Sequence, residues 1–150
     1  MPTNEAHWLG LRHVALNVAD PARSKRFYSE LLGMTVEWEP DPDNVYLTSG
    51  LDNLALHRSA VGPVPAGALD HIGFVLKHAE DVDVWEARVR AYGARIVKPL
   101  KTHRDGARSF YFADPDGYVI QMLFHPPLRN LPGAAHNPAP IPSSTDNLGA

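Results

Sequence analysis

Two stretches of the sequence decide the fold, LRHVALNV at Leu11–Val18 and LDHIGFVL at Leu69–Leu76. Each is an apolar run of strand length, and each carries a histidine at its third position. His71 follows His13 by 58 residues, and both stretches fit the pattern L-x-H-[VI]-[AG]-[LF]. One polar residue at the same place in two similar strands indicates an internal repeat.

A helix-like segment follows each stretch. In the first half, Asp20 is suited to cap the helix and Pro21 to its first turn, while Gly33 can end it. In the second half, Gly93 stands at the corresponding end. Apolar residues recur at helical spacing in both segments: Phe27, Tyr28, Leu31 and Leu32, then Val82, Trp85, Val89 and Tyr92. The repeat therefore extends from the strand through the helix.

Three short strand candidates complete each half. They are residues 34–38, 44–48 and 53–57 in the first half, and 94–98, 108–112 and 118–124 in the second. The sequence ADPDGY between the last two is a tight turn, because Pro115 presets φ and Gly117 accepts a positive φ. The sequence thus predicts an α+β fold of two tandem βαβββ modules.

The expected modules cover about residues 8–60 and 68–125, within one domain at 1–125. A Pro/Gly-rich link at 61–68 joins them. Residues 126–150 form a tail with six prolines, which predicts a segment that is neither helix nor central strand, but disordered or an extended strap.

Composition limits the function classes. The chain has 150 residues, of which 44% are hydrophobic and 21% charged, as in an ordinary globular protein. Its net charge of −3 and the lack of a basic stripe argue against nucleic acid as a partner. Without cysteine, disulfides and thiolate metal sites are excluded. No membrane-length apolar run or signal peptide is visible, so we expect no membrane partner and a cytoplasmic location by default.

Strand alternation places both histidines away from the helix. Val14 and its alternate neighbours should pack on the helix, which leaves His13 on the opposite face, and the same parity applies to His71. If the two modules pair symmetrically, these imidazoles converge. Two neutral imidazoles with a third donor make a divalent-metal site with open positions, and Gln121 is the obvious third donor.

The paired modules, the two histidines and the run RSFYFADPDGYVIQ at 108–121 resemble the vicinal oxygen chelate superfamily. That superfamily includes glyoxalase I, extradiol dioxygenases, fosfomycin-resistance transferases and bleomycin-resistance proteins. The resemblance covers roughly residues 8–125. It implies an incurved, cup-shaped mixed sheet with helices on the outside, and a divalent metal (Fe, Mn, Ni or Zn) held by His13, His71 and Gln121.

Two positions depart from the family pattern. Gln121 stands where the family's metalloenzymes usually have a glutamate, so a neutral amide replaces a charged ligand. Ala55 stands where glyoxalase I has a glutamate that is ligand and base, so glyoxalase I activity itself is not expected. A three-ligand site is closer to the dioxygenase and fosfomycin-transferase arrangement.

Other side chains are candidates for chemistry around the metal. His57 shares a face with Ala55 and could move protons or bind the metal, or could line the rim. The loop KTHRDGARSF at 101–110 is either a solvated hairpin loop or a lid whose His103 acts as acid–base and whose Arg108 meets an anionic substrate. Tyr111 and His125 are further candidates for substrate contact.

The leading interpretation is a metal-dependent enzyme of lyase, isomerase, transferase or dioxygenase type, acting on a small organic substrate chelated through oxygen atoms. A second interpretation is a metal-free protein that sequesters an antibiotic or toxin, and a third is a degenerate domain kept for protein contacts. A homodimer is expected, because two-module members often dimerise. The sequence leaves open whether the modules pair within the chain or between copies.

Overall fold

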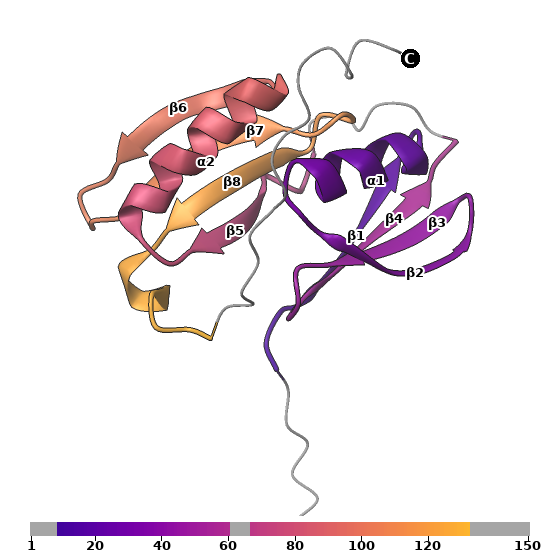
Figure 1. Ribbon diagram of the computed structural model, residues 1–150, viewed down its shortest axis with the longest axis horizontal. Coiled ribbons are helices and arrows are strands. Elements are labelled where there is room, and N and C mark those ends of the chain that lie inside the picture. Colours follow the sequence, from indigo (N-terminus) through magenta and orange to yellow (C-terminus); the bar gives the residue numbers. More distant parts are fainter. Residues whose placement is uncertain (1–8, 61–66, 133–150) are drawn as a thin grey trace, which may run out of the picture.

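The computed structural model describes residues 9–60 and 67–132 and shows two βαβββ modules, which confirms the predicted repeat (Figure 1). Module 1 consists of β1 (His13–Val18), α1 (Pro21–Glu30), β2 (Thr35–Asp41), β3 (Asn44–Thr48) and β4 (Asn53–Arg58). Module 2 consists of β5 (Ile72–Leu76), α2 (Ala79–Tyr92), β6 (Ile96–Thr102), β7 (Arg108–Ala113) and β8 (Val119–Phe124), followed by the short 3-10 helix η1 (Pro126–Leu128).

Each module folds around its own four-stranded mixed sheet. The strand orders are β1-β4-β3-β2 and β5-β8-β7-β6, with the first pair of each sheet parallel and the others antiparallel. His13 therefore begins β1 and His71 directly precedes β5, and these two strands are the equivalent edge strands of separate sheets. Within the described residues the sheets stay unclosed, so one chain carries the two halves of the expected cup side by side.

Local signals set the helix boundaries. The carboxylate of Asp20 accepts hydrogen bonds from the backbone N–H groups of Ala22 and Arg23, and Pro21 occupies the first turn of α1. In module 2, Gly93 follows the last residue of α2 and adopts a φ of 90°, the left-handed conformation that ends a helix. In the described residues no helix is long and apolar enough to cross a membrane.

The alternation predicted for the strands is confirmed. In β1, Leu16 and Val18 are buried in the core while His13, Ala15 and Asn17 are exposed. The core beneath the sheets consists of helix residues and the helix-facing strand residues, with Tyr28, Phe110, Phe112, Leu47, Leu56 and Ile120 fully buried. The opposite face of each sheet is called its open face below.

The turn between β7 and β8 joins module 2 to module 1. The buried Asp114 accepts a hydrogen bond from the hydroxyl of Tyr28 at 2.7 Å. Asp116 accepts from the backbone of Ala19 at 2.8 Å and from the hydroxyl of Ser24 at 3.1 Å. The sequence predicted this segment as a tight turn. The structure adds that both of its carboxylates bind the first module.

Arg88 of α2 makes the second connection between the modules. Its guanidinium donates to the carbonyl oxygens of Glu30 and Leu31, both at 2.8 Å. These carbonyls belong to the C-terminal end of α1, where a cation compensates both the free acceptors and the helix dipole. One side chain therefore caps α1 and attaches α2 to it.

Several boundaries differ from expectation. β5 begins at Ile72, so His71 directly precedes the strand instead of lying within it. Strand β2 continues to Asp41 and β6 runs over Ile96–Thr102, so both are longer or later than predicted. Each contains a proline, and each is an edge strand with an irregular register beside that proline, where a missing N–H is tolerated. The start of the proline-rich tail forms the single turn η1, contrary to the expected absence of helix, because proline suits a first helical turn. Residues 133–150 of the tail lie outside the described residues.

Candidate metal and substrate site

The open face of module 1 carries His13 in a defined hydrogen-bonded chain. Its Nδ1 lies 2.6 Å from Oδ1 of Asn53, the residue directly opposite it in the β1–β4 register. The Nδ2 of Asn53 donates in turn to Oε2 of Glu37 at 2.8 Å. Because the amide oxygen can only accept, Nδ1 of His13 carries the hydrogen and Nε2 has a free lone pair.

His57 lies on the same open face and has a similar chain. Its Nδ1 lies 2.6 Å from Oδ1 of Asn44, whose Nδ2 donates to the carboxylate of Asp41 at 2.9 Å. Its ring meets Tyr46 edge-on at 5.7 Å, and Tyr46 stacks on Trp38 at 5.1 Å. Trp38 is 59% exposed, so an aromatic row leads from His57 to the surface.

On the open face of module 2, His71 is oriented by its neighbour in the sequence. Its Nδ1 lies 2.5 Å from the carboxylate of Asp70, and this hydrogen bond lowers the pKa of Asp70. The His71 ring meets Tyr111 edge-on at 5.2 Å, and Lys98 places its ammonium 4.9 Å from the centre of the Tyr111 ring. Nε2 is therefore the ring nitrogen of His71 that is not engaged by Asp70.

Gln121 lies opposite Gly73 in the β5–β8 register and shares this face with His71. Its Nε2 donates to the hydroxyl of Tyr111 at 2.8 Å, which directs the amide oxygen toward Gly73. Oε1 lies 3.8 Å from the position that a side chain at residue 73 would occupy, and a glycine there leaves the space open. The carbonyl oxygen of Gln121 is thus turned toward the β5 side of the face.

These donors fit a divalent metal in their chemistry. Unprotonated imidazole nitrogens and an amide oxygen are ligands for Zn, Mn, Ni and Fe, and metal-binding histidines commonly have the other ring nitrogen fixed by an oxygen acceptor. They come from two sheets, however, since His13 contacts residues of module 1 and His71 contacts residues of module 2. Over residues 9–60 and 67–132, no three His, Cys, Asp or Glu side chains are grouped to hold a metal ion.

The remaining predicted residues fall into different places. Arg108 faces α2, where its guanidinium binds Asp83 at 2.7 Å and Thr102 at 2.6 Å, so it lies on the opposite side of the sheet from His71. His103 lies in the β6–β7 loop, 3.3 Å from the hydroxyl of Ser109. His125 precedes η1 and accepts from the backbone of Leu128 through its carbonyl oxygen.

Position 55 offers no donor. Ala55 is fully buried between Ala15 and Tyr46, its partners on the two neighbouring strands. The methyl side chain at residue 55 therefore supplies neither a metal ligand nor a base.

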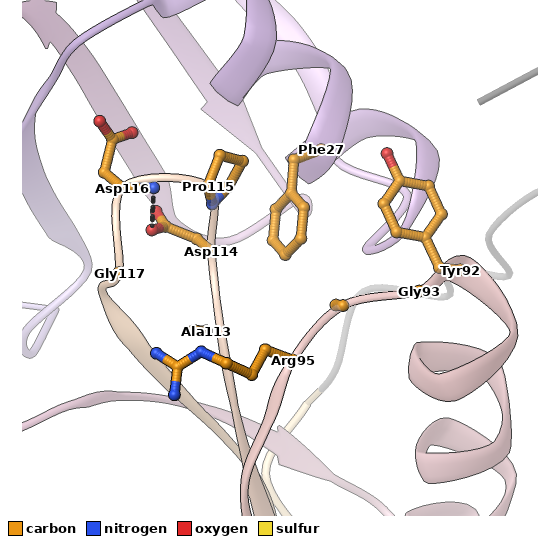
Figure 2. A pocket seen from close by; sticks show the side chains of 10 residues that line it. Phe27, Tyr92, Gly93, Arg95, Ala113, Asp114, Pro115, Asp116 and Gly117 are labelled. Carbon is orange, nitrogen blue, oxygen red and sulfur yellow. Dashed lines mark hydrogen bonds between the residues drawn. The ribbon is translucent and has the colours of Figure 1, made fainter. Parts of the chain in front are cut away.

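A hollow of about 460 Å³ lies elsewhere, at the junction of the modules (Figure 2). Its lining consists of Phe27, the end of α2 with Arg95, and the β7–β8 turn at 113–117. None of the predicted ligand or catalytic residues belongs to this lining, so the hollow and the open faces are separate features.

Sequence reasoning missed the residues that orient the histidines. Asp70 could have been found, because an acidic residue directly precedes His71. Asn53 and Glu37 depend on strand register and on an irregular β2, neither of which a single sequence reveals. Lys98 was missed because the predicted strand ended there, whereas β6 extends through it.

The family model of the Glyoxalase/Bleomycin resistance protein/Dioxygenase superfamily matches residues 10–122. The chain belongs to this superfamily. The predicted recognition of the vicinal oxygen chelate fold is thereby confirmed, together with its tandem modules.

Two curated relatives of this chain are enzymes. It is 34% identical over 116 residues to "Glutathione transferase FosA" of Serratia marcescens, covering 75% of this chain and 78% of that protein. It is 30% identical over 122 residues to "2,2',3-trihydroxybiphenyl dioxygenase" of Sphingomonas paucimobilis, covering 77% of this chain but only 41% of the dioxygenase. The chain thus spans less than half of that second relative.

Solved structures share the fold at lower identity. A glyoxalase-related enzyme from Fulvimarina pelagi superimposes with a TM-score of 0.66 at 23% identity, over 79% of this chain and 90% of that one. A lactoylglutathione lyase from Agrobacterium tumefaciens gives a TM-score of 0.65 at 20% identity, over 80% and 96%. These structural similarities show that this chain shares its fold with both proteins.

Proposed function

We propose that this chain is a metal-dependent enzyme of the vicinal oxygen chelate superfamily that acts on a small organic substrate through its oxygen atoms. His13, His71 and Gln121 would hold the divalent ion. When bound, such an ion supplies a Lewis acid that stabilises negative charge on substrate oxygens. The homology to a transferase and a dioxygenase supports a reaction on a small molecule.

The observation that carries the proposal is the shared orientation of the two imidazoles. In both, Nδ1 is bound to an oxygen acceptor, Asn53 for His13 and Asp70 for His71, and Nε2 is left to bind a ligand. The Nε2 of Gln121 likewise donates to the hydroxyl of Tyr111, so the amide oxygen of Gln121 is not used in that hydrogen bond. His57 has the same arrangement through Asn44, so the pairing of His13 with His71 rests also on their equivalent places in the two modules.

The proposed site is completed between two copies of the chain. His13 begins the edge strand β1, and His71 directly precedes the edge strand β5 of the other sheet. The hydrogen bonds of Asp114 and Arg88 hold the two modules of one chain by their helix and turn elements instead. Apolar side chains are exposed beside both histidines, with Leu11 at 92% before β1, Leu69 at 49% before β5 and Val75 at 46% on β5. Pairing β1 of one copy with β5 of another covers these groups and forms the cup.

Other residues have roles around the ion. His57 presents Nε2 as a base for a substrate proton, next to the aromatic wall of Tyr46 and Trp38. Lys98 supplies positive charge beside Tyr111 for an anionic substrate group. His103 and His125, at the β6–β7 loop and the end of β8, are proposed at the rim.

Arg108 is not assigned to the substrate, because Asp83 and Thr102 already bind its guanidinium on the helix side. The cytoplasmic location stays a prediction.

Calorimetric titration of tag-free protein with Zn²⁺, Mn²⁺, Ni²⁺ and Fe²⁺ tests the proposal. The native chain should bind at least one of these ions, and His13→Ala or His71→Ala should weaken binding by about 100-fold or more. His78→Asn is the matched control, because His78 stands at the N-terminus of α2. A native protein that is purified without metal and takes up none of the four ions would refute the function.

The alternative is a metal-free binding protein of bleomycin-resistance type. It is motivated by the lack of a carboxylate at the two positions occupied by Ala55 and Gln121. Quenching of tryptophan fluorescence by metal-free bleomycin distinguishes the two functions. Binding that survives His13→Ala in the presence of a chelator supports the binder, whereas the enzyme proposal expects no such binding.

A further inference from the structure

Glu37 lies two hydrogen bonds away from the proposed metal and has no part in the function described above. It stands on β2, an edge strand, and its carboxylate accepts from Nδ2 of Asn53 at 2.8 Å. A carboxylate has no hydrogen to donate, so the side of the Asn53 amide that faces it must be the NH₂ group. Glu37 therefore determines which way the Asn53 amide points.

The direction of that amide determines the protonation of His13. With its NH₂ group on Glu37, Asn53 turns its oxygen to Nδ1 of His13 at 2.6 Å. An oxygen acceptor requires the hydrogen to be on Nδ1, which leaves Nε2 as the unprotonated nitrogen. If the amide were reversed, its NH₂ group would face Nδ1 and favour the tautomer with the hydrogen on Nε2, so that Nε2 would have no lone pair for a metal.

We propose that Glu37 is a positioning residue that acts through Asn53 to hold His13 in the Nδ1–H tautomer. The part of the inference that concerns metal affinity rests on the proposed function. The part that concerns the tautomer does not, because it follows from hydrogen bonds within module 1 alone.

Two other histidines provide internal comparisons. His57 is bound through Asn44 to Asp41, and His71 is bound directly to Asp70. Neither chain includes Glu37. A change at Glu37 should thus alter one histidine and leave two unchanged, which separates a positional effect from a general loss of structure.

Long-range ¹H–¹⁵N correlation spectra of the metal-free protein test the tautomer at about pH 8.5, where histidine is ordinarily neutral. The native protein should show His13, His57 and His71 with the hydrogen on Nδ1. Glu37→Leu should move His13 toward the Nε2–H form and leave the other two unchanged. Glu37→Gln should preserve the native pattern, because its amide oxygen can accept from Asn53. Native His13 in the Nε2–H form, or no response to Glu37→Leu, would overturn the inference.

Calorimetric titration with Zn²⁺ tests the consequence for affinity. Glu37→Leu should weaken binding by about 10-fold, the lower end expected for groups that orient a ligand, and Glu37→Gln by less than about 3-fold. Glu39→Leu is the matched control, because Glu39 on the same strand binds Lys25 of α1. An affinity unchanged by Glu37→Leu overturns the metal part. If the native protein binds none of Zn²⁺, Mn²⁺, Ni²⁺ and Fe²⁺ but His13 still changes tautomer, the proposed function fails and the positioning of His13 stands.

Discussion

The hydroxyl of Tyr28 donates a hydrogen bond of 2.7 Å to the carboxylate of Asp114, which lies 86 residues later in the chain. Both side chains are buried, Tyr28 at 0% and Asp114 at 5% exposure. The same carboxylate accepts from the backbone N–H groups of Asp116 and Tyr118, both at 2.9 Å. One buried group thus shapes the β7–β8 turn and attaches it to α1.

Tyr28→Phe should destabilise the chain by about 1.5–3 kcal/mol, because it removes a hydrogen bond to a buried charged group. Urea unfolding at neutral pH measures this loss. Tyr46→Phe is the control, since Tyr46 lies on the open face, and should change the free energy of unfolding by less than about 0.5 kcal/mol. Equal effects of the two substitutions would show that the hydrogen bond between Tyr28 and Asp114 does not stabilise the folded chain.

The buried Asp114 also predicts that the stability of the chain depends on pH. Burial raises the pKa of Asp114 above its usual value of 3.8, although the hydrogen bond from Tyr28 opposes the shift. The folded state therefore holds the proton at pH values where the unfolded state has lost it. The contribution of Asp114 to stability is largest below its ordinary pKa and falls as the pH rises through the raised folded pKa.

Asp114→Asn removes the titrating carboxyl group, so a comparison of this variant with the native chain isolates the contribution of Asp114. The stability of the variant relative to the native chain should increase as the pH rises from about 4 toward neutrality. Urea unfolding at a series of pH values measures the difference. A difference that is flat, or that decreases with pH, would contradict a raised pKa at Asp114.

Arg88→Met should cost about 1–3 kcal/mol, because the carbonyls of Glu30 and Leu31 lose a charged donor at the end of α1. Arg90→Met is matched to it, since Arg90 binds Glu86 one turn away on the exposed side of α2, and should cost only about 0.3–0.5 kcal/mol. Thermal unfolding compares the two. An Arg90 variant as unstable as the Arg88 variant would contradict the capping account.

Gln121→Glu should strengthen divalent-metal binding by about 10-fold or more, because a carboxylate adds charge to two neutral imidazoles. Tyr111 can then donate its hydroxyl hydrogen to the new side chain, so its position need not change. Calorimetric titration with Mn²⁺ is suited to this comparison. Asn130→Asp makes the same chemical change at an exposed site, and an equal gain there would mean that residue 121 is not a ligand.

The repeat, the strand faces and the family were predictable, because they depend on local signals. Alternation in β1 is fixed by the pleat, and the cap at Asp20 is fixed by its neighbours. The chain from His13 through Asn53 to Glu37 was not predictable. It depends on the register of β1 with β4 and on an irregular strand β2.

Arg108 was predicted to contact the substrate, but the structure places it on the helix side of the sheet. Its position in a basic loop suggested an anion contact, but it begins β7 on the helix side and is bound by Asp83. The predicted strand already began at residue 108, but its faces were not assigned, and Arg108 shares the helix side with the buried Phe110 and Phe112. Convergence of His13 with His71 likewise depends on how modules or copies pair, which no single strand encodes.

The central claim is a metal site made by His13 of one copy and His71 of another. Mixed dimers of His13→Ala and His71→Ala chains, carrying different removable tags, test it most directly. In such a dimer one of the two sites takes both intact histidines, so calorimetry with Zn²⁺ should find one ion per mixed dimer, while each variant alone binds none. Absence of tight binding in the mixed dimer would contradict the claim, because it would mean that each site draws both histidines from one chain or that no site exists.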